Sequence, residues 1–124
     1  MIALGDTLYG PLDRKSTPHL WVIIYVGDEE LIMVYFTTYR RGKDDTCKVS
    51  LKEHPFIIEQ SCINYHGAQI PLISNVEIAI KNGYIKKDIP VSRQLLRKIK
   101  RGVVKSPHMR KKYKKYFARD SDVV

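Results

Sequence analysis

Two apolar runs joined by a short polar turn dominate the hydrophobic pattern of the chain. Residues 20–26 precede a polar break at residues 27–30, and Leu31–Thr38 follows it. Both runs lack Gly and Pro and are rich in β-branched and aromatic residues, so they predict a β-hairpin at the centre of a sheet. The near absence of polar alternation in Leu31–Thr38 indicates a strand covered on both faces.

Further short strands are predicted on both sides of this hairpin. We expect them at residues 2–9, 46–51, 61–65 and 69–73, with Gly, Pro and charged residues in the loops between them. The connections are too short for crossover helices. The strands should therefore pair antiparallel, in a small barrel or a strongly curved sheet.

The pattern changes in the last third of the chain. Residues 75–82 predict a short helix ended by Gly83. Residues 93–104 carry one apolar stripe under a basic outer face, which predicts an amphipathic helix, and residues 108–118 predict a second basic helix with an aromatic stripe. We therefore expect a mainly β, α+β protein. Residues 1–80 should form the barrel, and residues 81–124 a basic helical extension packed on the same domain.

Charge is distributed unevenly along the 124 residues. Residues 1–80 carry a net charge of −3, residues 81–119 carry +14, and the whole chain carries +9. A strongly basic last third indicates a surface that faces a polyanion, most simply a nucleic acid, and an acidic protein partner is the alternative.

The cysteines, the histidines and the N-terminus narrow the class of protein. Two cysteines do not make a disulfide framework, and none of the four histidines stands in a zinc-binding pattern, so we expect no metal and no other cofactor. No signal peptide is recognisable, and no apolar run approaches the roughly 20 residues that span a bilayer. We expect a cytoplasmic protein without a membrane segment.

The remaining polar groups suit metal-independent chemistry on an RNA phosphodiester. That reaction needs a base, an acid and donors to the phosphate. The candidates for catalysis are His19, Thr37, Thr38 and His54. If the hairpin is correct, antiparallel pairing places His19 at the same end of the sheet as Thr37. A surface histidine and a threonine with ordinary β-propensity are the plainer interpretation.

Cations beside these positions are candidates for holding the RNA backbone. They are Arg14, Lys15, Arg40 and Arg41.

The order of features resembles the MazF/PemK-like toxins of bacterial toxin–antitoxin systems. The resemblance rests on Gly5-Asp6, on the Pro-containing loop and apolar strand of residues 17–24, and on Phe36-Thr37-Thr38, and it covers roughly residues 4–75. It implies an SH3-like β-barrel, metal-independent endoribonuclease activity, a homodimer and an acidic antitoxin. It also implies that Thr37, with Thr38 beside it, takes the place of the family's catalytic threonine.

The family's catalytic arginine has no counterpart near Pro18, where His19 stands closest. Either His19 has taken the acid–base role, or the fold serves only for binding. Residues 54–57 and 61–65 also resemble a divergent PemK-like branch in which histidine and serine/tyrosine positions replace the usual set. That likeness adds His54, Ser61 and Tyr65 to the site, the last two as RNA-binding residues.

Overall fold

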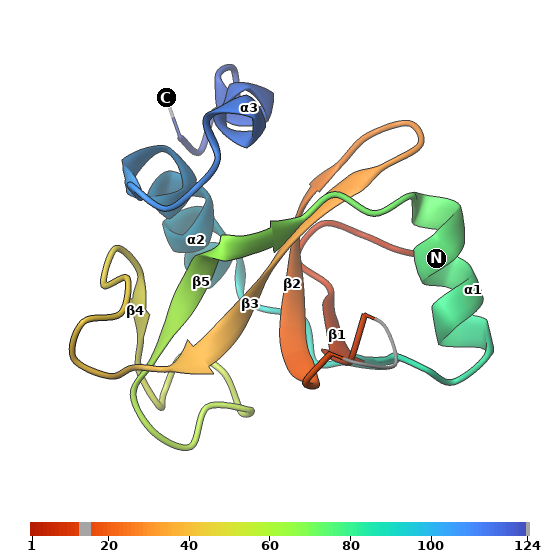
Figure 1. Cartoon of the computed structure of the whole chain (residues 1–124), viewed down its shortest axis with the longest axis horizontal. Coiled ribbons are helices and arrows are strands. Elements are labelled where there is room, and N and C mark those ends of the chain that lie inside the picture. The colour runs from red at the N-terminus through yellow and green to blue at the C-terminus, as the bar shows by residue number, and fades with distance from the viewer. Residues whose placement is uncertain (13–15, 124) are drawn as a thin grey trace.

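A computed structural model describes residues 1–12 and 16–123, and its core is one antiparallel sheet (Figure 1). The elements in chain order are β1 (Thr7–Gly10), β2 (His19–Val26), β3 (Leu31–Thr38), β4 (Lys48–Val49), β5 (Ser61–Gln69), α1 (Ile73–Lys81), β6 (Lys86–Asp88), α2 (Arg93–Lys105), α3 (Lys111–Lys114) and the 3-10 turn η1 (Lys115–Phe117). The strand order is β4-β5-β3-β2-β1-β6, and every printed pairing is antiparallel. The predicted α+β class is confirmed.

The sheet is not closed among the described residues, because β4 and β6 form its two edges and do not pair with each other. The central hairpin has the predicted bounds, and α2 ends one residue beyond its predicted end. The predicted strand at residues 46–51 shrinks to β4, and β5 extends four residues further than predicted. Strand β6 was not predicted, because its three residues are charged and exposed and show no apolar alternation.

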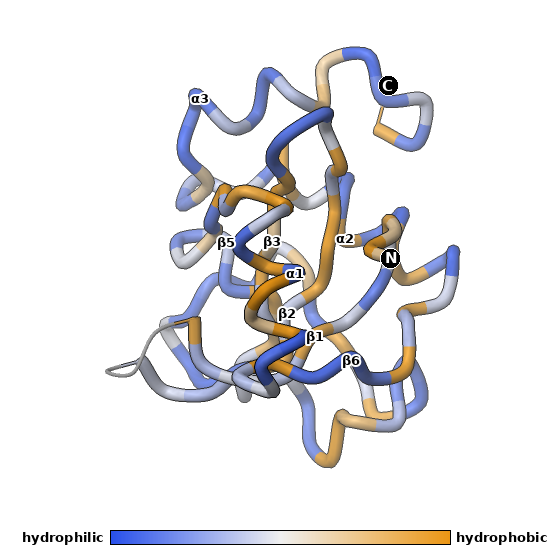
Figure 2. Tube along the Cα trace, turned by 90° about the vertical axis from the view of Figure 1, so that its right-hand side faces the viewer, coloured by the Kyte–Doolittle hydropathy of each residue, from blue (hydrophilic) through white to orange (hydrophobic). Residues whose placement is uncertain are grey.

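Helices cover the two faces of the sheet unequally. We call the side that packs against α2, α3 and η1 the α2 face; its buried cluster includes Val22, Val34, Ile63, Ile99 and Phe117. The other side, the α1 face, has a smaller cluster of seven buried residues that includes one residue of α1, Val76. Apolar residues are concentrated on the central strands and α1, and the C-terminal segment is largely hydrophilic (Figure 2). Part of the α1 face is left without a covering helix.

The amphipathic helix α2 follows directly from its sequence. The Ser92 hydroxyl accepts a hydrogen bond from the Leu95 amide at 3.0 Å, which caps the first turn. Lys100 lies on the buried side and is only 3% exposed. Its ammonium contacts Asp120 at 2.9 Å and Asp122 at 2.8 Å, so the C-terminal segment is held against α2 by a buried charge cluster. None of the helices in residues 1–12 and 16–123 is long and apolar enough to cross a membrane.

Removing the carboxylates of this cluster should destabilise the protein more than removing its lysine. In Asp120→Asn/Asp122→Asn the Lys100 ammonium stays buried without a counter-charge, which costs about 3–5 kcal/mol in comparable pairs. Lys100→Met keeps the apolar stem and deletes the buried charge, so its free energy of unfolding should stay within about 1 kcal/mol of the wild type. Urea unfolding of both variants measures the difference, and equal losses would contradict the burial argument.

Candidate functional site

Three neighbouring strands bring polar side chains to the uncovered part of the α1 face. The β2–β3 register ends at the pair of Trp21 with Tyr35, and His19 and Thr37 lie beyond it, at the same end of the two strands. On the other side of β3, Tyr35 pairs with Asn64 and Thr37 with Cys62. Side chains alternate between faces along a strand, so this set shares one face with Trp21. We call the partly exposed group of His19, Tyr35, Thr37 and Asn64 the open face.

The open face is organised around a stacked ring pair. The His19 and Tyr35 ring centroids lie 3.8 Å apart with the planes inclined by 17°, and Trp21 meets Tyr35 edge-on at 4.8 Å. Asn64 Nδ2 donates to the Tyr35 hydroxyl at 2.7 Å, and Asn64 Oδ1 accepts from the Gly67 amide at 2.9 Å. A Cβ on Gly67 would lie 2.5 Å from the Tyr35 ring, so only glycine fits there. The tyrosine that supports His19 is therefore held from two sides.

Burial favours the neutral forms of the His19 and Tyr35 side chains. Partial burial of His19 lowers the pKa of its imidazole below the ordinary value. Burial also raises the pKa of Tyr35, and the hydrogen bond from Asn64 only partly opposes that rise. Near pH 7, His19 is therefore an uncharged imidazole that can accept a proton. The indole Nε1 of Trp21 is buried and has no hydrogen-bond partner among the described residues.

A cavity of about 180 Å³ adjoins the open face at Thr37 and Asn64. Its other lining residues are Gly42, Lys43, Asp44, Cys62, Ile63, His66 and His108. The Lys43 ammonium donates to the Thr37 hydroxyl at 3.0 Å and to the Thr38 carbonyl at 2.8 Å. A cation, a hydroxyl and two imidazoles therefore surround one small space together with the Asp44 carboxylate, and the first four are donors suited to a phosphate group.

Asp44 joins the loop after β3 to the segment after α2. Its carboxylate accepts hydrogen bonds from the Ser106 hydroxyl at 2.6 Å and from the Thr46 amide at 2.9 Å. Burial alone would favour the neutral acid. The hydrogen bonds from Ser106 and Thr46, with His108 nearby, outweigh it and hold the pKa of Asp44 below its ordinary value. The Ser106 hydroxyl also accepts a hydrogen bond from the His108 amide at 3.1 Å, so Asp44 and Ser106 together hold the backbone of His108 at the cavity.

His19 and Thr37 share the α1 face by strand alternation, whereas His54 packs on a residue of the α2 face. His54 is 3% exposed and stacks on Phe36, a residue of the α2 face, with a centroid distance of 6.0 Å. Its Nε2 donates to the Ile89 carbonyl at 2.7 Å, and its Nδ1 accepts from the Phe56 amide at 3.1 Å. Both ring nitrogens are used by the backbone, so the predicted catalytic role of His54 is wrong for this site.

Two predicted RNA-binding residues are also buried away from the open face. Tyr65 is fully buried and donates to the Ile99 carbonyl at 2.8 Å, and Ser61 is 6% exposed and donates to the Glu59 carbonyl at 3.0 Å. Neither side chain can reach a phosphate, so these predictions are wrong. Thr38 follows Thr37 in the strand, and alternation turns its side chain to the opposite face.

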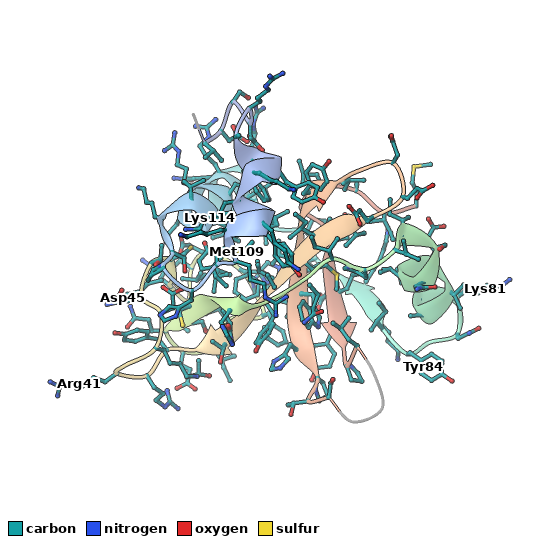
Figure 3. All side chains as sticks on the ribbon, turned by 45° about the horizontal axis from the view of Figure 1, so that its top comes forward. Arg41, Asp45, Lys81, Tyr84, Met109 and Lys114 are labelled. Atoms are coloured by element: carbon teal, nitrogen blue, oxygen red, sulfur yellow. The ribbon has the colours of Figure 1, made fainter. Side chains whose placement is uncertain are left out.

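The predicted cations lie outside the cavity. Arg40 contacts Glu59 at 3.8 Å and donates to the Tyr39 carbonyl at 3.0 Å. Arg41 extends from the loop after β3 at one end of the molecule (Figure 3). Arg14 and Lys15 lie outside the described residues. Instead, Lys43 supplies the cation at the cavity, and sequence reasoning missed it along with Asn64, His66 and His108. The one signal available in the sequence was the spacing of Cys62 and His66, which stand four residues apart and so share one face of an extended segment.

Both cysteine thiols are expected to be unreactive in the folded protein. Cys47 and Cys62 are each 1% exposed, and burial raises the pKa of Cys47 to about 11 and that of Cys62 above its ordinary value. A thiol reagent at pH 8 should label neither cysteine without denaturant and both in guanidinium. Rapid labelling of Cys62 in the native protein would show that the cavity opens to solvent.

Two larger cavities have a different character. One measures about 560 Å³ and lies between α1 and the residues after β1, with a lining that is mainly apolar. The other measures about 430 Å³ and is lined mainly by residues of α2, most of them charged. We assign the candidate site to the small cavity because it adjoins the open face and combines titratable groups with a hydroxyl. Within residues 1–12 and 16–123, no group of three or more His, Cys, Asp or Glu side chains is placed to hold a metal ion. The sequence matches no family model, no curated protein and no solved structure.

Proposed function

We propose that the protein binds single-stranded RNA across the open face and cleaves the RNA backbone without a metal ion. The observation that carries this proposal is that a neutral imidazole, His19, shares the open face with Thr37, whose hydroxyl contacts Lys43 at 3.0 Å beside a cavity lined by two further histidines. The site thus combines a base, phosphate donors and an acid on one uncovered surface.

In this mechanism His19 takes the proton of the ribose 2′-hydroxyl. The 2′-oxygen forms a bond to the adjacent phosphorus, and the bond from phosphorus to the 5′-oxygen breaks as His66, acting as the general acid, donates a proton to that oxygen. Lys43 and Thr37 donate to the non-bridging oxygens, where negative charge develops. The products are a 2′,3′-cyclic phosphate and a free 5′-hydroxyl.

The resemblance to MazF/PemK-like toxins extends this proposal. Such a ribonuclease would be a cytoplasmic toxin on a divergent SH3-like barrel, would form a homodimer and would be held inactive by an acidic antitoxin. An acidic small open reading frame beside the gene, and growth arrest on expression that Thr37→Ala relieves, would support this part of the proposal.

A non-catalytic RNA-binding module is the second candidate. The flat stacking of His19 on Tyr35 at 3.8 Å favours it, because aromatic faces on a sheet also serve as platforms for unpaired bases. The absence of the catalytic loop arginine of MazF/PemK-like toxins also favours a non-catalytic module.

Incubation of the purified protein with single-stranded RNA in EDTA separates the two candidates. The nuclease proposal expects fragments with cyclic-phosphate ends and no fragments from His19→Phe purified in the same way. Intact RNA, together with binding that weakens steeply with salt, would support the binding module instead.

A further inference from the structure

The basic C-terminal third contains two groups of cations in different electrostatic situations. On α2, three of the six cations form ion pairs with described carboxylates. Arg97 contacts Asp122 at 3.5 Å, Lys98 contacts Glu53 at 3.1 Å, and Lys100 contacts Asp120 at 2.9 Å. A polyanion that approached these three would have to displace carboxylates that are already bound, while the other cations of the helix, Arg93, Arg101 and Lys105, form no ion pair with a described carboxylate.

The segment of residues 108–115 is not neutralised in this way. It carries Arg110, Lys111, Lys112, Lys114 and Lys115, of which all but the half-buried Lys114 are exposed. None of them forms an ion pair with a described carboxylate. Lys114 donates to the Val104 and Ser106 carbonyls, and Arg110 donates to the Tyr113 hydroxyl. The charges of this segment are therefore available to an external anion.

The same segment lies along β5, next to the candidate site. His108 lines the 180 Å³ cavity together with Asn64 and His66 of β5. Lys112 and Lys115 line a second hollow, of about 270 Å³, together with Ile70, which follows the last residue of β5, and with Glu30, whose carboxylate accepts a hydrogen bond from the Tyr116 hydroxyl. The cations thus continue from the cavity toward the far end of that strand.

The backbone of the segment is held in place before any ligand arrives. Met109, Tyr113 and Phe117 are buried in the core cluster of the α2 face, beside Tyr65 and Ala68. Because these apolar anchors alternate with the cations, the cations project from a fixed support and lose less freedom when they bind phosphate.

We infer that residues 108–115 form an extension of the RNA site. Their cations would hold phosphates of nucleotides that lie beyond those bound at the open face. The inference rests on the proposed function and adds to it a substrate class, single-stranded RNA of more than a few nucleotides. Phosphate contacts of this kind add affinity without sequence preference. Continuity with the cavity favours RNA over an acidic protein as the occupant.

The test compares 4-nucleotide and 12-nucleotide 2′-O-methyl RNA, which lack the attacking hydroxyl and cannot be cleaved by the proposed mechanism. Three proteins are titrated over a range of salt: the wild type, Lys111→Gln/Lys112→Gln/Lys115→Gln, and a control of equal charge change, Lys52→Gln/Lys81→Gln/Lys86→Gln. The control lysines are exposed, and Lys81 lies at the opposite end of the molecule from Arg41 (Figure 3). Thermal unfolding verifies that both variants fold.

The wild type should bind the 12-mer at least tenfold more tightly than the 4-mer. In the segment variant that gain should fall to within twofold, and the slope of log K against log salt should drop by about 2 for three lost contacts. The control variant should retain both the affinity gain of the 12-mer over the 4-mer and the wild-type salt slope. Equal 12-mer binding by the segment variant and the wild type, an equal loss in the control, or tighter binding of an acidic peptide of matched charge would overturn the inference.

Failure of the proposed function gives a different result. In that case Thr37→Ala and Lys43→Gln would leave 4-mer binding unchanged, or the 4-mer would not bind at all. If only the extension fails, 4-mer binding remains sensitive to Thr37→Ala while the 12-mer gains nothing.

Discussion

Replacement of His19 by phenylalanine is expected to slow RNA cleavage by about 10²–10⁴-fold, the usual contribution of a general base, while RNA binding changes by less than threefold. Phenylalanine keeps an aromatic ring against Tyr35, where the native rings lie 3.8 Å apart, but it cannot accept a proton. His19→Ala removes both the base and the stacked ring, so it should weaken binding as well. Single-turnover cleavage and a separate binding titration distinguish the two losses.

The pH dependence gives the same prediction a second readout. Burial lowers the pKa of His19, and a base acts only when it is unprotonated. The single-turnover rate should therefore rise with pH through a value below the ordinary histidine pKa of about 6.5, and fall again at higher pH as the general acid loses its proton. If the His19→Phe variant cleaved RNA at the wild-type rate, His19 would have no role in the mechanism.

His54 provides the contrast within the same protein. It is buried and bonded to the backbone through both ring nitrogens, so His54→Ala should reduce stability. The cleavage rate of the folded fraction should stay close to that of the wild type. A loss of cleavage in fully folded His54→Ala would show that the α2 face takes part in the site.

Replacement of Gly102 by alanine is expected to destabilise the protein by about 3 kcal/mol, at the upper end of the range for overpacked cores. A Cβ at this position would lie 2.0 Å from the Tyr65 hydroxyl oxygen and 2.7 Å from the ring carbon that bears it. Tyr65 is fully buried, and its hydroxyl donates to the Ile99 carbonyl of the same helix at 2.8 Å. The ring cannot yield without breaking that bond or moving α2 away from the sheet.

Helix propensity makes the sign of this prediction informative. An exposed helical glycine changed to alanine gains about 1 kcal/mol, so α2 alone would be stabilised by the substitution. Urea unfolding of Gly102→Ala should instead show a lower free energy of unfolding than the wild type. The double variant Gly102→Ala/Tyr65→Phe removes the nearest atom, the Tyr65 hydroxyl oxygen, and should recover part of the lost stability. A gain in stability from Gly102→Ala would mean that α2 does not pack on Tyr65 as described.

The hairpin and α2 could be read from the sequence because each has a strong local signal. Continuous β-branched runs predict buried strands, and a stripe of Leu95, Ile99 and Val103 predicts one buried helix face. The α+β class followed from these elements, and so did the placement of His19 and Thr37 at the same end of the sheet, because antiparallel pairing of a known hairpin determines which ends coincide.

The assembly of the site was decided only by the tertiary structure. His54, Ser61 and Tyr65 looked available in the sequence, but the face toward which a strand residue points, and what covers it, depends on register and on helices distant in the chain. Lys43, His66 and His108 come from three segments and meet at one cavity through contacts such as Asp44 to Ser106. Local patterns determine which elements form, and packing between distant segments determines which polar groups share a surface.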